Sequence, residues 1–260
     1  RMQVGSVSWL TYADRLMELP VGLLGVAMAT VILPALSVSV AKNKAEDYQA
    51  TLQWGLITML VVSLPSVAGL VVLSEPILMT LFMRDQFSLL DVSMTQVAFW
   101  GYGIGLVPIV MIKLLAPVFY ANKDTKTPVR IAICAIFFTQ ILNFIFWMVL
   151  PADIKHAGLA MAISGGAWLN AVALVIKLRS RGLFVDDNKW LLVLRDSVFA
   201  TLLMSIVIFF AAREVDWLLQ GAWERLGILL AIIFLGVITY SCVLLIFGRR
   251  VGDFLRSRVS

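Results

Sequence analysis

Residues Gly5–Ser37 have the sequence GSVSWLTYADRLMELPVGLLGVAMATVILPALS, which is mostly apolar but carries Asp14, Arg15 and Glu18 near its beginning. A membrane-spanning helix needs about 20 apolar residues, and the segment Pro20–Val40 has that length. An arginine at the centre of a bilayer costs about 2.5–3.5 kcal/mol, so such residues usually face a protein interior or a water-filled cavity. We therefore expect a spanning helix whose charges are turned toward a cavity.

The polar and small residues of this stretch recur every three or four positions, which places them on one face of a helix. The first half of the face is polar and charged, and the second half is small, as expected where another helix backbone approaches closely. Pro20 and Pro34 remove backbone donors and are expected to bend the helix. The residues of this face are Ser8, Thr11, Arg15, Glu18, Gly22, Gly25 and Ala29.

The composition is that of a polytopic membrane protein. Hydrophobic residues make up 61% of the chain and charged residues 14%, against about 45–50% and 25% in soluble domains. The net charge is +5, but the basic residues lie in short loops between apolar segments. That pattern sets membrane orientation, so we expect no nucleic-acid partner.

We predict an all-α fold, a polytopic transmembrane helix bundle with about seven spanning helices. A short amphipathic helix at the membrane surface is predicted within Ser74–Asp91, with Ser74 as its N-cap. Thr127 and Pro128 are expected to open another helix as N-cap and first residue. The predicted spans are Pro20–Val40, Thr51–Leu73, Val92–Leu115, Pro128–Leu150, Ala157–Ile176, Trp190–Ala212 and Arg225–Phe247.

The loop charges predict the orientation of the chain. One set of loops, together with the C-terminal tail, is far more basic than the opposite set, so the positive-inside rule places it in the cytoplasm. Arg15 and Glu18 then lie in the outer half of the bilayer. The basic residues of the first set are Lys42, Lys44, Lys123, Lys126, Lys177, Arg179, Arg181, Lys189, Arg249, Arg250, Arg256 and Arg258.

The run Gly5–Pro20, with its continuations Gly22–Ala27 and Thr30–Pro34, resembles the MurJ/MviN family of lipid II flippases. That family belongs to the multidrug/oligosaccharidyl-lipid/polysaccharide (MOP) exporter superfamily. The similarity continues to the C-terminus, although Thr11 stands where the family often has an aromatic residue. Because the family has two helical lobes, the resemblance implies that this chain is a fragment that begins near the start of the second lobe.

The resemblance also implies a domain division and a function. Residues 1–180 correspond to second-lobe helices, and residues 181–260 to two additional helices and a cytoplasmic tail. In the family, those two helices help form a groove for the lipid tail. The implied function is flipping of lipid II, the lipid-linked peptidoglycan precursor, across the bacterial cytoplasmic (inner) membrane by alternating access. The implied partners are lipid II, membrane lipids and the missing N-terminal lobe, so we expect the isolated chain to be inactive.

Arg15, Glu18 and Ser8 are the candidate substrate-binding residues, since the matching positions of the family lie in its central cavity. A guanidinium is a planar, permanently charged fork that pairs with two phosphate oxygens at once. The alternative for Arg15 is a structural ion pair with Glu18, three residues away. Glu18 is either that counterion or a site whose protonation or ion binding follows transport. Asp14, about 100° round the helix, is expected to hold a cap or a neighbouring helix.

The remaining intramembrane polar residues are given structural roles. Gln140 and Asn143 share one helix face, and Ser164 and Asn170 lie on the next helix, where polar groups commonly bond between helices. Lys113 is expected to extend toward the cytoplasmic interface. Cys134 and Cys242 are expected to act as small hydrophobes.

The sequence contains no recognisable catalytic, metal or cofactor motif, so we predict that the protein is not an enzyme and needs no cofactor. Two functions other than lipid II flipping remain open. One is export of O-antigen lipids or drugs by another member of the superfamily. The second is a non-transporting membrane scaffold for cell-wall assembly, for which the charges of Arg15 and Glu18 would be dispensable.

Overall fold

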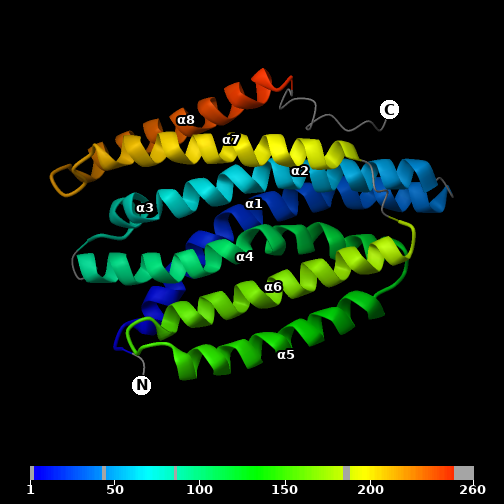
Figure 1. Cartoon of the computed structure of the whole chain (residues 1–260), viewed down its shortest axis with the longest axis horizontal. Helices are drawn as coiled ribbons and strands as arrows, with labels where there is room; N and C mark the ends of the chain where they lie inside the picture. The colour runs from blue at the N-terminus through cyan, green and yellow to red at the C-terminus, as the bar shows by residue number, and fades with distance from the viewer. Residues whose placement is uncertain (1–2, 43–44, 85–86, 184–187, 249–260) are drawn as a thin grey trace.

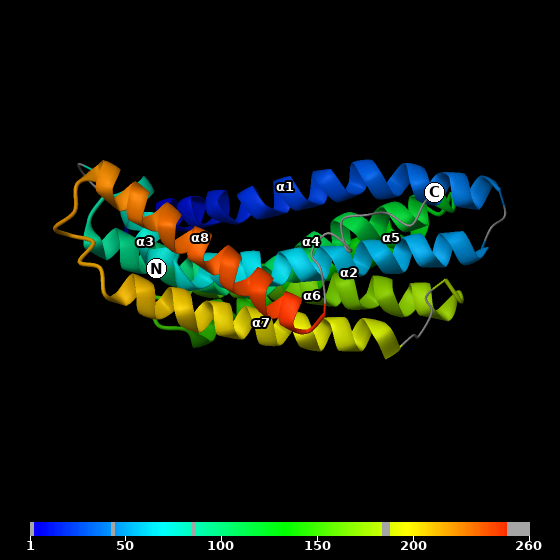
Figure 2. The same cartoon turned by 90° about the horizontal axis from the view of Figure 1, so that it is seen from above.

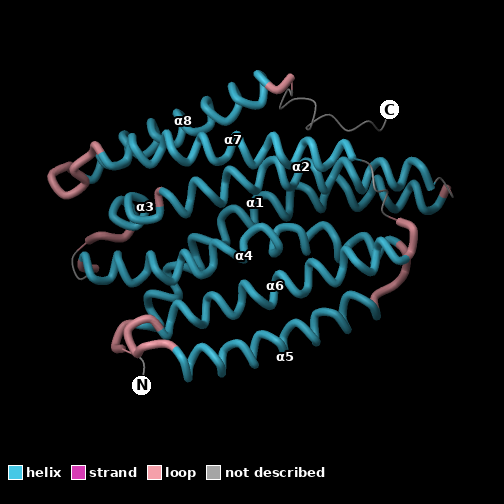
Figure 3. The backbone as a smooth tube through the Cα atoms, in the orientation of Figure 1, coloured by secondary structure: helices cyan, strands magenta, loops and turns pink. Residues whose placement is uncertain are grey.

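A computed structural model describes residues 3–42, 45–84, 87–183 and 188–248. Within these residues the chain forms helices joined by loops (Figures 1 and 3). The helices are α1 (Ser6–Ala41), α2 (Ala45–Val72), α3 (Ser74–Leu81), α4 (Leu89–Ala121), α5 (Lys126–Val149), α6 (Lys155–Ser180), α7 (Asn188–Arg213) and α8 (Ala222–Ile246).

Seven of the helices are long and apolar enough to cross a membrane, which confirms the predicted all-helical membrane fold. Only α3 is too short, with eight residues. The first spanning helix already begins at Ser6 and contains both Pro20 and Pro34. The charged residues Asp14, Arg15 and Glu18 therefore lie inside this helix rather than in a loop before it.

The helices pack in a sequence that differs from their order in the chain. From one side of the bundle to the other, Figure 1 shows α8, α7, α2, α1, α4, α6 and α5, and each neighbouring pair is in contact. Seen from above in Figure 2, α1 runs along one edge of the bundle. The last pair, α7 and α8, therefore lies against α2 and α3, far from α5 and α6.

Glycines on α4 allow α6 to pack unusually close. A Cβ atom added at Gly101 would come within 3.0 Å of the Ala157 carbonyl oxygen, and one added at Gly105 within 2.7 Å of the Ser164 Cα. The Ser164 hydroxyl also donates a 2.6 Å hydrogen bond to the Gly101 carbonyl, as predicted for a polar group between helices. Gly101 and Gly105 thus form a small-residue contact of the kind that holds membrane helices together.

Two prolines inside helices each free a backbone carbonyl, and in both cases another helix supplies the missing donor. Pro65 has no N–H for the Val61 carbonyl, which instead accepts a 2.6 Å hydrogen bond from the Tyr240 hydroxyl of α8. Pro108 likewise frees the Ile104 carbonyl, which accepts a 2.9 Å bond from the Trp168 indole of α6. Since every backbone polar group must be satisfied inside a bilayer, these bonds fix α8 to α2 and α6 to α4.

Replacement of Tyr240 by phenylalanine is expected to destabilise the packing of α8 on α2. The substitution keeps the ring but leaves the buried Val61 carbonyl without a donor, at a cost of about 1–3 kcal/mol. Thermal unfolding of the protein in detergent measures this loss. Tyr120→Phe is the matched control, because Tyr120 is exposed and its hydroxyl makes no hydrogen bond to a described residue. Equal melting of the two variants would contradict the assigned role of Tyr240.

The helix predicted within Ser74–Asp91 is shorter than that segment, and its predicted N-cap is wrong. Helix α3 ends at Leu81, contacts α4, α2 and α8, and buries six of its eight residues. Ser74 is not the N-cap, because Leu73 occupies that position and the Ser74 hydroxyl donates to the Val71 carbonyl. The segment is therefore packed against the bundle by most of its residues.

Helix α5 begins two residues before the predicted start, at Lys126. Asp124 accepts a 3.0 Å bond from the Thr127 backbone N–H and a 2.5 Å contact from the Arg181 guanidinium at the end of α6. Hydrogen bonds from Thr127, followed by those from Arg181, hold the pKa of Asp124 well below its ordinary range. The α4–α5 loop is thereby fixed to the end of α6 by a carboxylate that stays ionised.

Candidate functional site

The polar face of α1 is open along the side of the bundle, although the opposite face is packed. Ser8, Thr11, Arg15, Glu18 and Gly22 are all exposed. The opposite face is buried against the bundle through Trp9, Ala13, Leu16 and Met17. The side chains that were predicted to face a cavity are therefore exposed on one face of α1, from Ser8 to Gly22.

The inner end of the predicted line is covered or lies beyond what is described. Gly25 is buried beneath the side chain of Lys113 from α4. The side chain of Ala29, the last member of the predicted face, lies outside the described residues. Nothing lies within 4 Å of a Cβ atom added at Gly22, so the open part of the face runs at least from Ser8 to Gly22.

Arg15 and Glu18 do not form the ion pair that was the structural alternative for them. Among the described residues, neither side chain has a hydrogen-bond or ion-pair partner. A spanning helix that carries two such charges exposes them to a cavity, to water or to a further protein surface. Asp14 is half-buried and likewise bonds to no described residue, contrary to the expectation that it holds a cap or a neighbouring helix.

The beginning of α1 is fixed by contacts with two other helix ends. The Trp9 indole donates a 2.7 Å hydrogen bond to the Asp91 carboxylate, which also closes a capping box with Ser88 at the start of α4. The Trp9 ring lies 5.2 Å from the ring of the buried His156. Nε2 of His156 is 2.9 Å from the Met94 carbonyl oxygen. These contacts hold Ser8 and Arg15 at a fixed depth relative to α4 and α6.

The side-chain amides of α5 do not form the hydrogen bonds to other helices that the sequence predicts. Gln140 is exposed, and its side-chain oxygen accepts a 3.4 Å bond from Asn143 of the same helix. Oδ1 of Asn143 is buried without a partner among the described residues. Of this polar group, only Ser164 makes a described bond to another helix.

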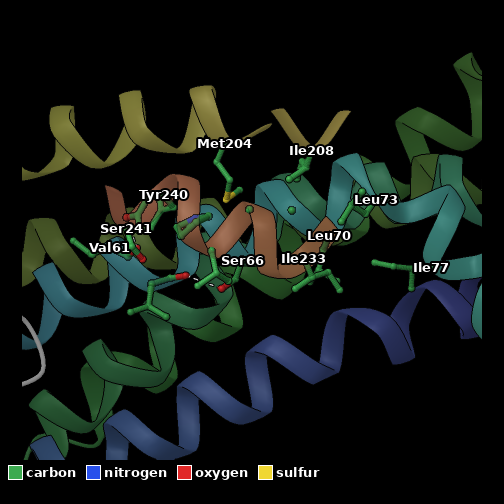
Figure 4. A pocket seen from close by; sticks show the side chains of 15 residues that line it. Val61, Ser66, Leu70, Leu73, Ile77, Met204, Ile208, Ile233, Tyr240 and Ser241 are labelled. Carbon is green, nitrogen blue, oxygen red and sulfur yellow. Dashed lines mark hydrogen bonds between the residues drawn. The ribbon is translucent and has the colours of Figure 1, made fainter. Parts of the chain in front are cut away.

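A second candidate feature is an apolar cavity of about 360 Å³ between α2, α3, α7 and α8. Figure 4 shows side chains from these helices around it, among them Leu70, Ile77, Met204, Ile208 and Ile233. The Tyr240 hydroxyl is occupied by the Val61 carbonyl, so the cavity presents almost only hydrocarbon. Such a space suits an alkyl or polyprenyl chain and offers nothing to hold a charge.

The described residues contain no group of three or more potential metal-ligand side chains among His, Cys, Asp and Glu. Cys134 and Cys242 are exposed on apolar helices, rather than packed inside. Of the features present, the Arg15 guanidinium on α1 is suited to binding an anion and the cavity to binding a hydrocarbon chain.

Comparison with known proteins identifies the family. Residues 1–243 match the family described as lipid II flippase MurJ. The chain belongs to this family. A lipid II flippase MurJ from Burkholderia cenocepacia is 39% identical over 258 residues, which are 98% of this chain and 49% of the relative. A probable lipid II flippase MurJ from Vibrio cholerae is 38% identical over 255 residues, covering 97% of this chain and 47% of the relative.

The fold has a solved counterpart in the same family. A lipid II flippase MurJ in an inward closed conformation superimposes with a TM-score of 0.74 at 25% identity, covering 98% of this chain and 49% of that one. The chain thus spans about half the length of the MurJ relatives that it matches. It is a multi-pass membrane protein of a transporter family.

Proposed function

We propose that the protein to which this chain belongs flips lipid II across the bacterial cytoplasmic membrane by alternating access. The observation that carries the proposal is the open polar face of α1, on which Arg15 has no partner among the described residues, in a chain of the lipid II flippase MurJ family. A diphosphate must leave bulk water to cross a bilayer, and a cationic cavity replaces part of its hydration. The rest of this cavity is supplied by an N-terminal lobe of the same protein.

Each residue of the open face has a separate role in this proposal. Arg15 holds the diphosphate through its guanidinium fork. Ser8, two turns earlier on the same face and so nearer the outer surface of the membrane, contacts the head group. Glu18 does not neutralise Arg15 among the described contacts, which favours its alternative role as a site for a proton or a coupling ion.

The apolar cavity between α2, α3, α7 and α8 receives the polyprenyl tail while the head group crosses. Its lining is almost entirely hydrocarbon, and burying alkyl groups there needs no polar partner. Residues 1–180 then act as the second lobe, and residues 181–260 as the additional pair and tail. We place the C-terminus in the cytoplasm, following the basic loops.

Translocation of lipid II in proteoliposomes by the full-length parent protein tests the proposal. We expect added lipid II to become inaccessible to a membrane-impermeant reagent, and to do so faster than in vesicles without the protein. The chain 1–260 alone is expected to be inactive, because half of a two-lobed cavity cannot close around the substrate. Transport of an O-antigen lipid or a drug in place of lipid II would favour another exporter function. The absence of any transport would favour a membrane scaffold.

A further inference from the structure

Helix α5 (Lys126–Val149) lies at the outer edge of the bundle and leaves an apolar groove beside α6 (Lys155–Ser180). All of α5 is described, and only Pro128 and Ala135 of this helix are buried. Its packing is almost entirely against α6 (Figure 1). The groove has a volume of about 560 Å³. Its main lining residues are Phe138 and Leu142 of α5 and Gly165, Trp168, Val172 and Ile176 of α6.

The groove has the length of one leaflet of a bilayer. Gly165 lies near the middle of α6, and Ile176 lies near its end. The distance between them along the helix is about 16 Å, and one leaflet has about 15 Å of hydrocarbon. A spanning helix packed in the groove would need twice this length, whereas an acyl chain of a single leaflet fits it. The end at Ile176 is the one that we place in the cytoplasm, so the leaflet is the inner one.

Arg130 of α5 stands at the cytoplasmic end of the groove. A Cβ atom added at Gly166 would lie 3.3 Å from the Ala135 carbonyl oxygen, which fixes the register of the two antiparallel helices. Arg130 precedes Ala135 by five residues, so it lies about 8 Å nearer the cytoplasm, at the level of Val172. Helical side chains lean toward the N-terminus of their own helix, which directs the guanidinium onward to the level of Ile176.

Arg130 also lies on the side of α5 that lines the groove. Arg130, Cys134 and Phe138 follow one another at intervals of four residues, which places them along one side of the helix. Arg130 and Cys134 are both exposed. The Arg130 side chain makes no hydrogen bond or ion pair with a described residue, so its charge is open to a ligand in the groove.

A second guanidinium approaches the same point from α6. Arg179 is exposed and follows Val172 by seven residues, so it lies on the groove side of α6. Its side chain leans back toward Ile176, because the N-terminus of α6 is at the opposite end of the helix. The acidic residue of the neighbouring loop, Asp124, is already bound by Thr127 and Arg181. The apolar groove therefore ends in positive charge.

We propose that the groove between α5 and α6 binds an anionic phospholipid of the inner leaflet, with one acyl chain in the groove and the phosphate held by Arg130 and Arg179. A guanidinium pairs with two phosphate oxygens at once, and basic residues at the cytoplasmic surface attract anionic lipids. This lipid is bound rather than transported, and it holds the outer helix α5 to α6. The site is separate from the apolar cavity between α2, α3, α7 and α8.

The native Cys134 allows lipid binding to be measured at the groove itself. In the full-length protein without other cysteines, Cys134 is labelled with a small fluorophore, and the protein is placed in nanodiscs that contain chain-brominated lipid as a quencher. We expect brominated phosphatidylglycerol to quench at a mole fraction at least about tenfold lower than brominated phosphatidylcholine does. The same label on Cys242, which is exposed on the distant helix α8, is the control and is expected to show no preference.

Three variants separate the charge from the groove. Arg130→Gln is expected to lower the preference for phosphatidylglycerol about fivefold, whereas Arg130→Lys retains most of it. Val172→Trp fills the groove but keeps both charges, and is expected to weaken quenching by phosphatidylglycerol. Val172 is 47% exposed, so a larger side chain there does not disturb the core. Lys42→Gln is the matched control, since it removes one exposed charge beyond the end of α1.

Four results would overturn the proposal. Equal quenching by the two lipids at Cys134 would mean that Arg130 only extends to the membrane surface among ordinary lipids. No quenching by either lipid would mean that another protein segment covers the groove. A preference unchanged in Arg130→Gln and Val172→Trp would place the head group elsewhere. Displacement of phosphatidylglycerol by an equal amount of lipid II would assign the groove to lipid II. None of these measurements requires transport, so the proposed function is tested separately.

Discussion

Replacement of Arg15 by alanine in the full-length protein is expected to lower lipid II translocation at least about a hundredfold. Hydrogen bonds to charged groups contribute about 1.5–3 kcal/mol each, and the guanidinium offers two to a phosphate. Arg15→Lys keeps the charge but not the fork, so we expect partial activity. Initial rates of lipid II translocation in proteoliposomes measure both effects.

The same substitution is expected to leave the stability of the protein unchanged. Arg15 is exposed and bonds to no described residue, and substitutions at such sites usually change stability by less than about 0.5 kcal/mol. Arg213→Ala is the matched control for transport, because Arg213 is exposed at the end of α7, away from α1. Normal translocation by both Arg15 variants would make the charged residues of α1 structural. The substrate site would then have to lie elsewhere in the full-length protein.

The spanning helices were predictable from sequence because the bilayer imposes their length and apolar composition. All seven predicted spans have a helical counterpart. The environment of α3 was not predictable. Ser74, Pro76 and the amphipathic pattern are equally compatible with a surface helix and with a packed one. What decides between them is contact with α8, about 150 residues later in the chain.

The open face of α1 was predictable because its polar and small residues recur every three or four positions along a single helix. The place of Lys113 was not, because it depends on the register in which α4 packs beside α1. The donors to the carbonyls that prolines leave free were not predictable either. The prolines at 65 and 108 predict two backbone carbonyls without a donor in their own helices. Only the tertiary structure shows that Tyr240 and Trp168 donate to them.

Replacement of Gly105 by leucine is expected to prevent α4 and α6 from packing as they do in the native bundle. Even the first added carbon would lie 2.7 Å from the Ser164 Cα and 2.8 Å from its Cβ, so the backbones must separate. Overpacking typically costs about 1–3 kcal/mol and sometimes more. We expect the cost of a whole leucine side chain at a contact between two backbones to lie at or above the top of that range. Thermal unfolding in detergent, followed by size-exclusion chromatography, measures the loss.

Gly227→Leu on α8 separates this steric effect from the general effect of replacing a helical glycine. No heavy atom lies within 4 Å of a Cβ atom added at Gly227, so leucine there only improves helix propensity, by up to about 1 kcal/mol. We expect that variant to melt at or slightly above the wild-type temperature, while Gly105→Leu melts far below it or fails to fold. Gly105→Ala should fall between them. If Gly105→Leu melts at the wild-type temperature, α6 does not approach α4 this closely. The hydrogen bond from Ser164 to Gly101 would then not explain how the two helices pack.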